Sequence, residues 1–400
     1  MFKWIEQGGV TSPEGFAAAG VSCGVKLKKK KDLCLIVSEV EARVGVTFTT
    51  NRIKAAPVKL SMQHARQGVV KAIVANSGNA NACTGVRGIR DARAMADKVA
   101  GLVGCRRRKV LVCSTGKIGI PLPIENVLTG IETAFKRLSH LGGDAAAKAI
   151  RTTDTTTKQG AVEIKVGGKT VRIGGMAKGA GMIHPNMATM LAFLTSDLAI
   201  EKELLQRMTG EIVQESFNMI SVDGDTSTND TVFVLANGVA GNEEIHAEHP
   251  DYPQVREAFK AVMSMLARMI VEDGECITHV VHLKVQGAAS DTDARKIVDA
   301  LAHSPLVKSS WAGADPNWGR IMDVIGYSGA RVREELVDIY YDGLCAVKGG
   351  VAANVPAHRI KRVVEKKNFS ITMDLHLLEG KAELLVNDLT PGYVKFNMGD

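Results

Sequence analysis

The chain has 400 residues, of which 45% are hydrophobic and 23% charged, an ordinary composition for a globular protein with room for two domains. Aromatic residues make up only 4%, which argues against a stacking surface for nucleic acid. The net charge of +7 comes largely from two basic runs, 26–31 and 106–109, which lack interleaved aromatics and indicate solvated turns. We therefore expect no nucleic-acid partner.

The cysteines and the N-terminus bear on the compartment. Seven cysteines occur without a Cys-x-x-Cys pair, a pattern typical of reduced thiols. Residues 1–9 lack the apolar core of a signal peptide, and no apolar run reaches the roughly 18 residues of a membrane span. These features predict a cytoplasmic protein without a membrane partner.

The first half of the chain alternates apolar strands with helices. A strand pair is expected over 33–50, and strands followed by small polar loops over 68–85 and 109–119. Helical spacing covers 89–104, which ends at a glycine, and 124–138.

The second half continues the alternation. Residues 161–179 predict a hairpin with Gly167 and Gly168 at the turn, followed by a strand at 189–197. Helices are expected over 201–220, 252–274 and 291–305, with strands at 230–238 and 279–288. A loop is expected over 311–320, and further strands run to the end near 381–397. The pattern favours a layered α/β fold with largely antiparallel sheets.

Thr189 is the most informative candidate for chemistry. It stands between Ala188 and Met190, at the start of the apolar strand, and follows the glycine-rich stretch GGMAKGAG, which contains Lys178. A threonine at such a place is usually only a strand residue. The small neighbour Ala188 and the flexible cationic loop upstream raise the alternative that Thr189 is a nucleophile.

The chain itself could supply the base that a threonine nucleophile needs. Attack of the Thr189 hydroxyl on the Ala188 carbonyl would form an ester, and water would then cut the chain. The freed α-amine of Thr189 has a pKa close to neutral pH and suits a general base. One residue then provides both nucleophile and base.

An acyl-transfer site also needs hydrogen-bond donors for the developing oxyanion. The Thr115 hydroxyl and the Gly116 N–H follow a predicted strand and are candidates for that role. Residues 223–230 resemble a calcium loop only loosely, because Thr228 stands where glycine is required, so a polar turn or hydrogen-bond cluster is preferred. His184 could be catalytic or could position its loop. No metal site is expected.

The longer motifs resemble those of a known family, the ornithine acetyltransferases (glutamate N-acetyltransferases) of arginine biosynthesis. The resemblance covers nearly the whole chain and rests on motifs that occur in the family's order. They are residues 8–24, 48–58, 76–85, 114–119, 152–155, 178–197, 216–231, 313–321 and 326–329.

The resemblance implies a self-cleaving enzyme. The chain would be cut between Ala188 and Thr189 into an α chain, 1–188, and a β chain, 189–400, which assemble as an α₂β₂ heterotetramer. Thr189 would carry an acetyl group from N-acetylornithine to glutamate, with acetyl-CoA as a further possible donor and no cofactor. The implied fold is an α-β-β-α sandwich similar to N-terminal-nucleophile hydrolases over 1–278, with a smaller α/β domain over 279–400.

The resemblance also assigns site residues. Thr115 and Gly116 would form the oxyanion hole. The substrate-binding residues would be Thr155, Lys178, Thr189, Glu275 and Asn397. Lys178 can neutralise a substrate carboxylate and Glu275 can pair with an ammonium group, so both charges of an amino acid would be matched.

Three stretches depart from the family pattern. Residues 273–279 read DGECITH where the family has DGEGATK, Lys117 stands at a commonly apolar position, and the end at FNMGD lacks a last Ser or Thr contact. We expect these departures to affect substrate affinity more than the nucleophile. A self-processing amidohydrolase or aminopeptidase is the alternative function, because water could also accept the acyl group. A non-catalytic relative is a third hypothesis.

Overall fold

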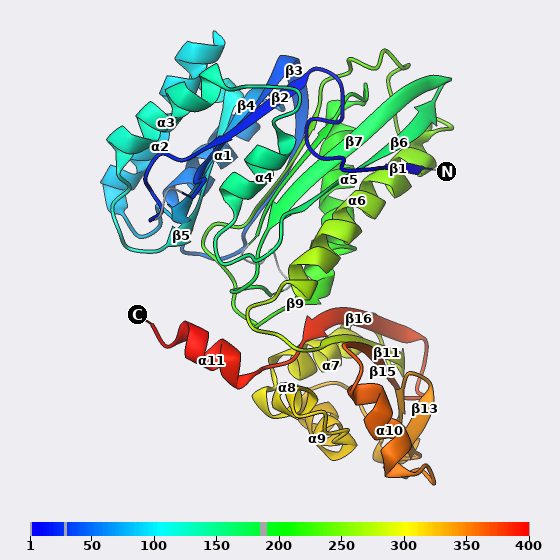
Figure 1. The fold of residues 1–400 in the computed structure, drawn as a ribbon. Coiled ribbons are helices and arrows are strands. Elements are labelled where there is room, and N and C mark those ends of the chain that lie inside the picture. Colours follow the sequence, from blue (N-terminus) through cyan, green and yellow to red (C-terminus); the bar gives the residue numbers. More distant parts are fainter. Residues whose placement is uncertain (1, 28–29, 185–189, 400) are drawn as a thin grey trace. The chain divides into compact units, whose positions relative to one another are not determined.

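The computed structural model describes residues 2–27, 30–184 and 190–399 (Figure 1). Its contacts divide the chain into two compact units. The first unit takes the described residues within 1–179, 186–218 and 226–270, and the second takes those within 180–185, 219–225 and 271–400. The main stretch of the second unit therefore starts eight residues before the position expected from the sequence.

The first unit contains a nine-stranded sheet in the described part of the chain. Its order is β1-β6-β7-β8-β10-β3-β4-β5, with β2 paired to β3. Neighbours are antiparallel except β8 with β10 and β4 with β5. The strands are β1 (Lys3–Ile5), β2 (Phe16–Val21), β3 (Leu33–Phe48), β4 (Val69–Asn79), β5 (Val110–Lys117), β6 (Lys158–Val166), β7 (Lys169–Lys178), β8 (Leu191–Ser196) and β10 (Thr231–Ala236).

Strand β3 is one long element where the sequence predicts a strand pair. Residues 38–42 hold no glycine, proline or asparagine that would favour a tight turn, so the chain stays extended through a register shift between Val37 and Ala42. One end of β3 pairs with β2 and the other with β10. Hydrogen bonding through β3 thereby links all nine described strands of the first unit. The expected layered α/β fold is confirmed.

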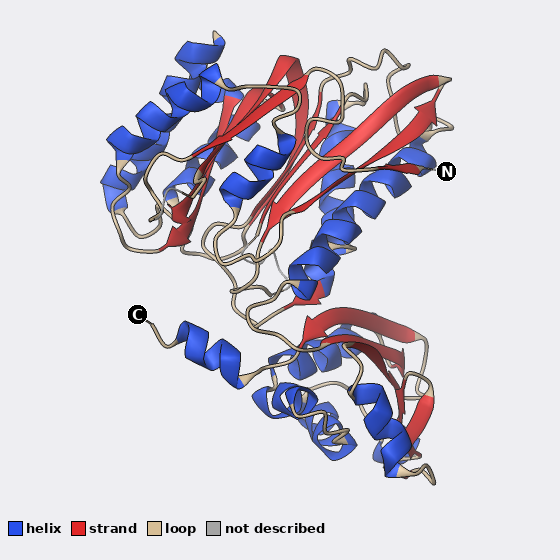
Figure 2. Ribbon diagram, viewed as in Figure 1, coloured by secondary structure: helices blue, strands red, loops and turns tan. Residues whose placement is uncertain are grey.

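Helices cover the faces of this sheet (Figure 2). They are α1 (Ala56–Ala65), α2 (Gly85–Val103), α3 (Ile124–Lys136), α4 (Gly143–Ile150), α5 (Lys202–Gln214) and α6 (Tyr252–Glu272). Helices α1, α2 and α3 pack on one apolar cluster with β4 and β5. Helix α4 packs on another, which also takes Phe193 of β8 and Phe233 of β10. Alternating residues of β4 thus enter different cores, as expected for a sheet buried on both faces.

The hairpin predicted at 161–179 is confirmed. Val166 pairs with Lys169, which leaves Gly167 and Gly168 as a two-residue turn with φ of 53° and 79°. Both angles lie in the left-handed region that favours glycine. The hairpin fixes the register of β7, and β7 ends at Lys178.

The second unit has a seven-stranded sheet in the order β14-β13-β12-β15-β11-β16-β9. Its strands are β9 (Ile220–Ser221), β11 (Val280–Ala288), β12 (Asp338–Tyr341), β13 (Leu344–Lys348), β14 (Val351–Ala352), β15 (Asn368–Asp374) and β16 (Gly380–Asn387). Its helices are α7 (Asp291–His303), α8 (Pro305–Ala312), α9 (Trp318–Tyr327), α10 (Ala357–Val364) and α11 (Pro391–Asn397). Trp311 and Tyr341 lie in its apolar core.

Three predictions are wrong in or next to the second unit. The helix expected over 201–220 ends at Gln214, and Ile220 begins β9. Residues 391–397 form helix α11 and not a strand, because Pro391 opens the helix and the Thr390 hydroxyl accepts the Tyr393 N–H at 3.1 Å. The loop expected over 311–320 is shorter and covers 313–317. Helix α8 runs to Ala312, and α9 begins at Trp318 with Asn317 as its N-cap. Within the described ranges, no helix combines the length and apolar character needed to span a membrane.

Candidate active site

The predicted oxyanion-hole residues lie near the end of β5. Thr115 is buried, and Gly116 is exposed with a φ of 133°, a conformation open to glycine and strained for other residues. Gly116 pairs with Gly78 of β4, and a Cβ on Gly116 would lie 2.3 Å from the Gly78 carbonyl carbon. Only glycine therefore fits at position 116.

Lys178 lies beside Thr115. Its Nζ donates to Thr115 Oγ1 at 3.5 Å, and both side chains are buried. Strands β5 and β7 bring the two residues together from positions 63 residues apart in the chain. The structure thus groups three predicted site residues, Thr115, Gly116 and Lys178, in the first unit.

A buried aspartate accompanies this lysine and was missed by the sequence analysis. Asp154 Oδ1 accepts hydrogen bonds from Lys158 Nζ and from the Gly179 N–H, each at 2.7 Å. Burial raises the pKa of Asp154, but the Lys178 and Lys158 ammonium groups and the Gly179 N–H outweigh it, and the pKa falls well below its usual range. Thr155, the next residue, is exposed, and its carbonyl accepts from Arg151 at 2.7 Å.

Lys26 adds a further cation near this group. Burial lowers its pKa to about 8, the Asp32 carboxylate opposes that shift, and the Lys178 ammonium adds to it. Lysines 26, 158 and 178 thus surround Asp154 in a largely buried region. This arrangement favours an anionic ligand, such as a carboxylate or a developing oxyanion.

The described chain resumes at Met190, after the predicted cleavage site. Pro185, Asn186, Ala188 and Thr189 lie outside the described residues, so the nucleophile and the scissile bond stay predictions. The Met190 N–H donates to Asp230 Oδ1 at 2.9 Å, and Asp230 is fully buried. Its neighbour Asn229 donates to the carbonyls of Ala80 and Ser114, at 2.7 and 2.8 Å.

Glu275 and Asn397 come together in the second unit. Asn397 Nδ2 donates to Glu275 Oε2 at 3.0 Å. The Glu275 N–H donates to the Ala180 carbonyl at 2.9 Å, and a Cβ on Gly181 would lie 2.5 Å from the Glu275 carboxyl group. Because Gly181 has no side chain, there is room for the Glu275 carboxyl group, and Glu275 is half-buried.

The departures around Glu275 have structural counterparts. Cys276, where the family has glycine, adopts a φ of 56°, a left-handed conformation that is strained for a residue with a Cβ. His279, where the family has lysine, contacts Asp388 Oδ2 through Nδ1 at 2.9 Å. Cys276 is thus strained, whereas His279 contacts a buried carboxylate.

The segment just before the undescribed residues 185–189 is held by the second unit. Asp223 accepts the N–H groups of Met182 and Ile183, at 2.6 and 2.8 Å, and the Tyr393 hydroxyl at 3.1 Å. The 223–230 stretch is thus a hydrogen-bond cluster, as preferred from its sequence. His184 Nδ1 lies 2.9 Å from His303 Nε2, and burial followed by the His303 and Arg295 charges lowers the pKa of His184 to about 4.

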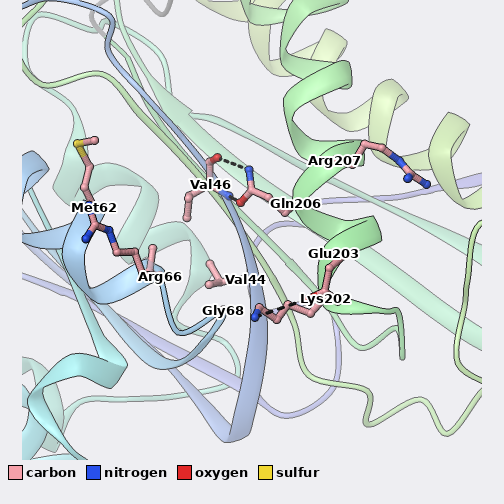
Figure 3. A pocket seen from close by; sticks show the side chains of 10 residues that line it. Val44, Val46, Met62, Arg66, Gly68, Lys202, Glu203, Gln206 and Arg207 are labelled. Atoms are coloured by element: carbon pink, nitrogen blue, oxygen red, sulfur yellow. Dashed lines mark hydrogen bonds and ion pairs between the residues drawn. The ribbon is translucent and has the colours of Figure 1, made fainter.

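A separate cavity of about 500 Å³ opens on the first unit (Figure 3). The Gln206 side chain lines it and exchanges hydrogen bonds of 2.9 and 3.0 Å with the Val46 backbone. None of the predicted site residues that the structure describes lines it. The lining residues are Val44, Val46, Met62, Ala65, Arg66, Gly68, Lys202, Glu203, Gln206 and Arg207.

Comparison with known proteins identifies relatives over nearly the full length. The profile described as "ArgJ family" matches residues 17–399. The "Arginine biosynthesis bifunctional protein ArgJ" of Symbiobacterium thermophilum is 46% identical over 397 residues, which cover 99% of this chain and 98% of that protein. The protein of the same name from Bacillus subtilis is 42% identical over 391 residues, covering 98% and 96%.

Two solved structures are also similar. The crystal structure of the Bacillus halodurans arginine biosynthesis bifunctional protein ArgJ is 42% identical, with a TM-score of 0.44, and covers 47% of this chain and 98% of its own. The Mycobacterium tuberculosis ornithine acetyltransferase complexed with ornithine is 40% identical, with a TM-score of 0.43, and covers 46% and 98%.

Proposed function

Because the chain belongs to the ArgJ family, we propose that it is an arginine-biosynthesis acetyltransferase that moves the acetyl group of N2-acetyl-L-ornithine to L-glutamate. The transfer is ping-pong: Thr189 takes the acetyl group as an ester, ornithine leaves, and glutamate then accepts the group. The word bifunctional in the relatives' names supports a second activity, acetyl transfer from acetyl-CoA to glutamate.

One observation carries this proposal, the buried contact between Lys178 and Thr115 beside Gly116. Acetyl transfer develops negative charge on the carbonyl oxygen, and a donor aimed at that oxygen typically lowers the barrier by about 2.7–4 kcal/mol. In our proposal, Thr115 and Gly116 are the donors and Lys178 binds the substrate carboxylate. Glu275, held by Asn397, binds the ammonium group of the substrate, and Thr155 contributes a further contact.

The active form is proposed to arise by self-cleavage between Ala188 and Thr189. The α chain, 1–188, and the β chain, 189–400, then stay together as an α₂β₂ heterotetramer. We also propose a cytoplasmic location, supported by seven cysteines that are all free thiols.

Two experiments test the proposal. A denaturing gel of the purified protein should resolve two fragments, and N-terminal sequencing of one should begin at Thr189. An intact chain in an active preparation would rule out self-cleavage. The second experiment incubates the enzyme with N-acetylornithine, with and without glutamate. Ornithine release should require glutamate; equal release without it would identify a hydrolase instead.

A further inference from the structure

Lys308 is a buried cation in the second unit. It lies in α8 with only 3% of its surface exposed, and its Nζ donates to the Val222 carbonyl. Lysine is rarely buried this deeply without a compensating charge, because removing an ammonium group from water is costly. Burial lowers the pKa of Lys308 to about 8, whereas the Asp223 and Asp388 carboxylates act in the opposite direction. The ammonium group is therefore mostly charged at neutral pH, and these two aspartates supply the offsetting charge.

Asp223, the first of these aspartates, holds two separate segments of the chain. Its carboxylate accepts the Met182 and Ile183 N–H groups at 2.6 and 2.8 Å. It also accepts the hydroxyl of Tyr393, in α11, at 3.1 Å. One carboxylate thus fixes α11 together with a segment that is distant from it in the sequence.

Asp388, the second aspartate, holds the loop that follows Glu275. It is buried, and it accepts the Thr278 N–H at 3.0 Å as well as the Thr278 hydroxyl. The next residue, Leu389, donates its N–H to the Lys308 carbonyl at 3.3 Å. The loop after Glu275 and helix α8 are therefore linked through two consecutive residues.

The segments held by the two aspartates are those that contact Glu275. The Glu275 N–H donates to the Ala180 carbonyl at 2.9 Å, and Glu275 Oε2 accepts from Asn397 Nδ2 at 3.0 Å. Ala180 and Asn397 belong to the two segments that Asp223 holds, whereas the chain after Glu275 is held by Asp388. The position of the Glu275 carboxyl group therefore depends on both aspartates.

We propose that Lys308 is a positioning residue for the candidate substrate-ammonium site, an inference that rests on the proposed function. Its charge offsets those of the two aspartates, and their hydrogen bonds hold Glu275 and Asn397 in place. Lys308 thus acts through these groups and does not itself bind the substrate. Without the cation, ionised carboxylates at these places would be costly, so they would take up protons or draw in water. Either change weakens the hydrogen bonds that the carboxylates accept.

The first test measures acetyl transfer from N-acetylornithine to glutamate by Lys308→Met, which keeps a long side chain without the charge. We expect KM for N-acetylornithine to rise by about 10–100-fold, the scale of a misplaced binding group, while kcat changes by less than about threefold. KM does not depend on the folded fraction of a preparation, whereas a purely structural loss lowers the apparent kcat. An unchanged KM, or a loss confined to kcat, would overturn the inference.

Lys348→Met is the matched control. Lys348 also offsets a buried aspartate of the second unit, because its Nζ lies 2.6 Å from Asp338 Oδ2. The Asp338 carboxylate has its other polar contacts with Tyr340, Gly349 and His376. We expect this variant to keep the wild-type KM, and an equal rise of KM in both variants would contradict the inference. A wild-type protein that transfers no acetyl group would instead refute the proposed function.

Hydrogen exchange gives a readout that does not require activity. In Lys308→Met, the amide protons of residues 275–279 and 389–397 should exchange at least about 10-fold faster than in the wild type, because the hydrogen bonds that hold these segments are weakened. Residues 338–348, in the same unit, should exchange as in the wild type. Unchanged exchange in the first two segments, or equal acceleration in all three, would show that Lys308 does not position the site.

Discussion

Lys158 donates a 2.7 Å hydrogen bond to Asp154, and neither side chain is exposed to solvent. A second pair with the same spacing and distance, Lys148 with Asp144, lies on the surface, with side chains 49% and 53% exposed. The two pairs share residue types, spacing and distance but differ in burial, in helical setting and in the Gly179 N–H that Asp154 also accepts. The surface pair therefore serves as a control for the loss of a lysine, and the buried pair as the test.

Loss of the buried lysine should be strongly destabilising. Lys158→Met removes one partner of a buried ion pair and should lower the free energy of unfolding by about 3–5 kcal/mol. Lys148→Met, at the exposed pair, should change it by less than about 1 kcal/mol. Denaturant unfolding of both variants measures the difference, and equal effects would contradict the assigned burial.

The Asp154 carboxylate should make the stability of the folded chain depend on pH. The pKa of Asp154 is lowered in the folded chain, so its contribution is present above the ordinary titration range of aspartate and is lost as pH falls through the folded pKa. The stability difference between wild type and Asp154→Asn should therefore shrink as pH falls below about 4. Unfolding curves at several pH values, with Asp144→Asn as control, test this sign.

Position 116 should accept no side chain. Gly116→Ala places a Cβ 2.3 Å from the Gly78 carbonyl carbon at a φ of 133°. We expect a loss of at least about 100-fold in acetyl transfer, the scale seen when an oxyanion donor is displaced. Gly119→Ala is the control, because it shares a positive φ, 81°, but meets no atom within 4 Å. Comparable activity in the two variants would argue against Gly116 as an oxyanion donor.

Replacing Cys276 with glycine should stabilise the folded chain. Its φ of 56° is strained for cysteine, so Cys276→Gly should raise the free energy of unfolding by about 0.5–1 kcal/mol after the added flexibility of the unfolded chain is subtracted. Cys345→Gly, inside strand β13, should lower it. Thermal unfolding of both variants is sufficient, and a destabilised Cys276→Gly would refute the strain.

Glu275 should govern substrate affinity more than the chemical step. If it binds the substrate ammonium group, Glu275→Gln should raise KM for N-acetylornithine by about 10–100-fold, the value of a charge-assisted hydrogen bond of about 1.5–3 kcal/mol. Glu379→Gln, an exposed residue of the same unit, should leave KM unchanged. A fall in kcat with constant KM would instead assign Glu275 to the transition state.

The sequence predicted the local elements better than the long-range contacts. The hairpin at Gly167 and Gly168 could be predicted because its turn chemistry is local. The continuity of β3 and the helix at 391–397 could not be predicted from the apolar pattern. A register shift lets β3 continue as one strand, and the Thr390 cap starts the helix. Thr115 and Lys178 were expected at one site from family resemblance, and they do lie together.

The buried aspartates escaped prediction for a physical reason. Asp154 and Lys158 are four residues apart, a spacing that usually indicates an exposed helical pair, yet here the segment is not helical and is fully covered. Asp230 was read as part of a polar turn, since nothing local reveals that its carboxyl group accepts from Met190, 40 residues away. Burial of a charge is a property of the packed chain and not of its motif.

The place of residues 180–184 within the second unit has a consequence for the proposed self-cleavage. These residues precede the proposed cut, yet their hydrogen bonds run to Asp223 and Glu275, which follow it. If the chain is cut where we propose, each product chain encodes only part of the second unit. Two halves synthesised separately would then have to reconstitute that unit and not merely dock two finished domains.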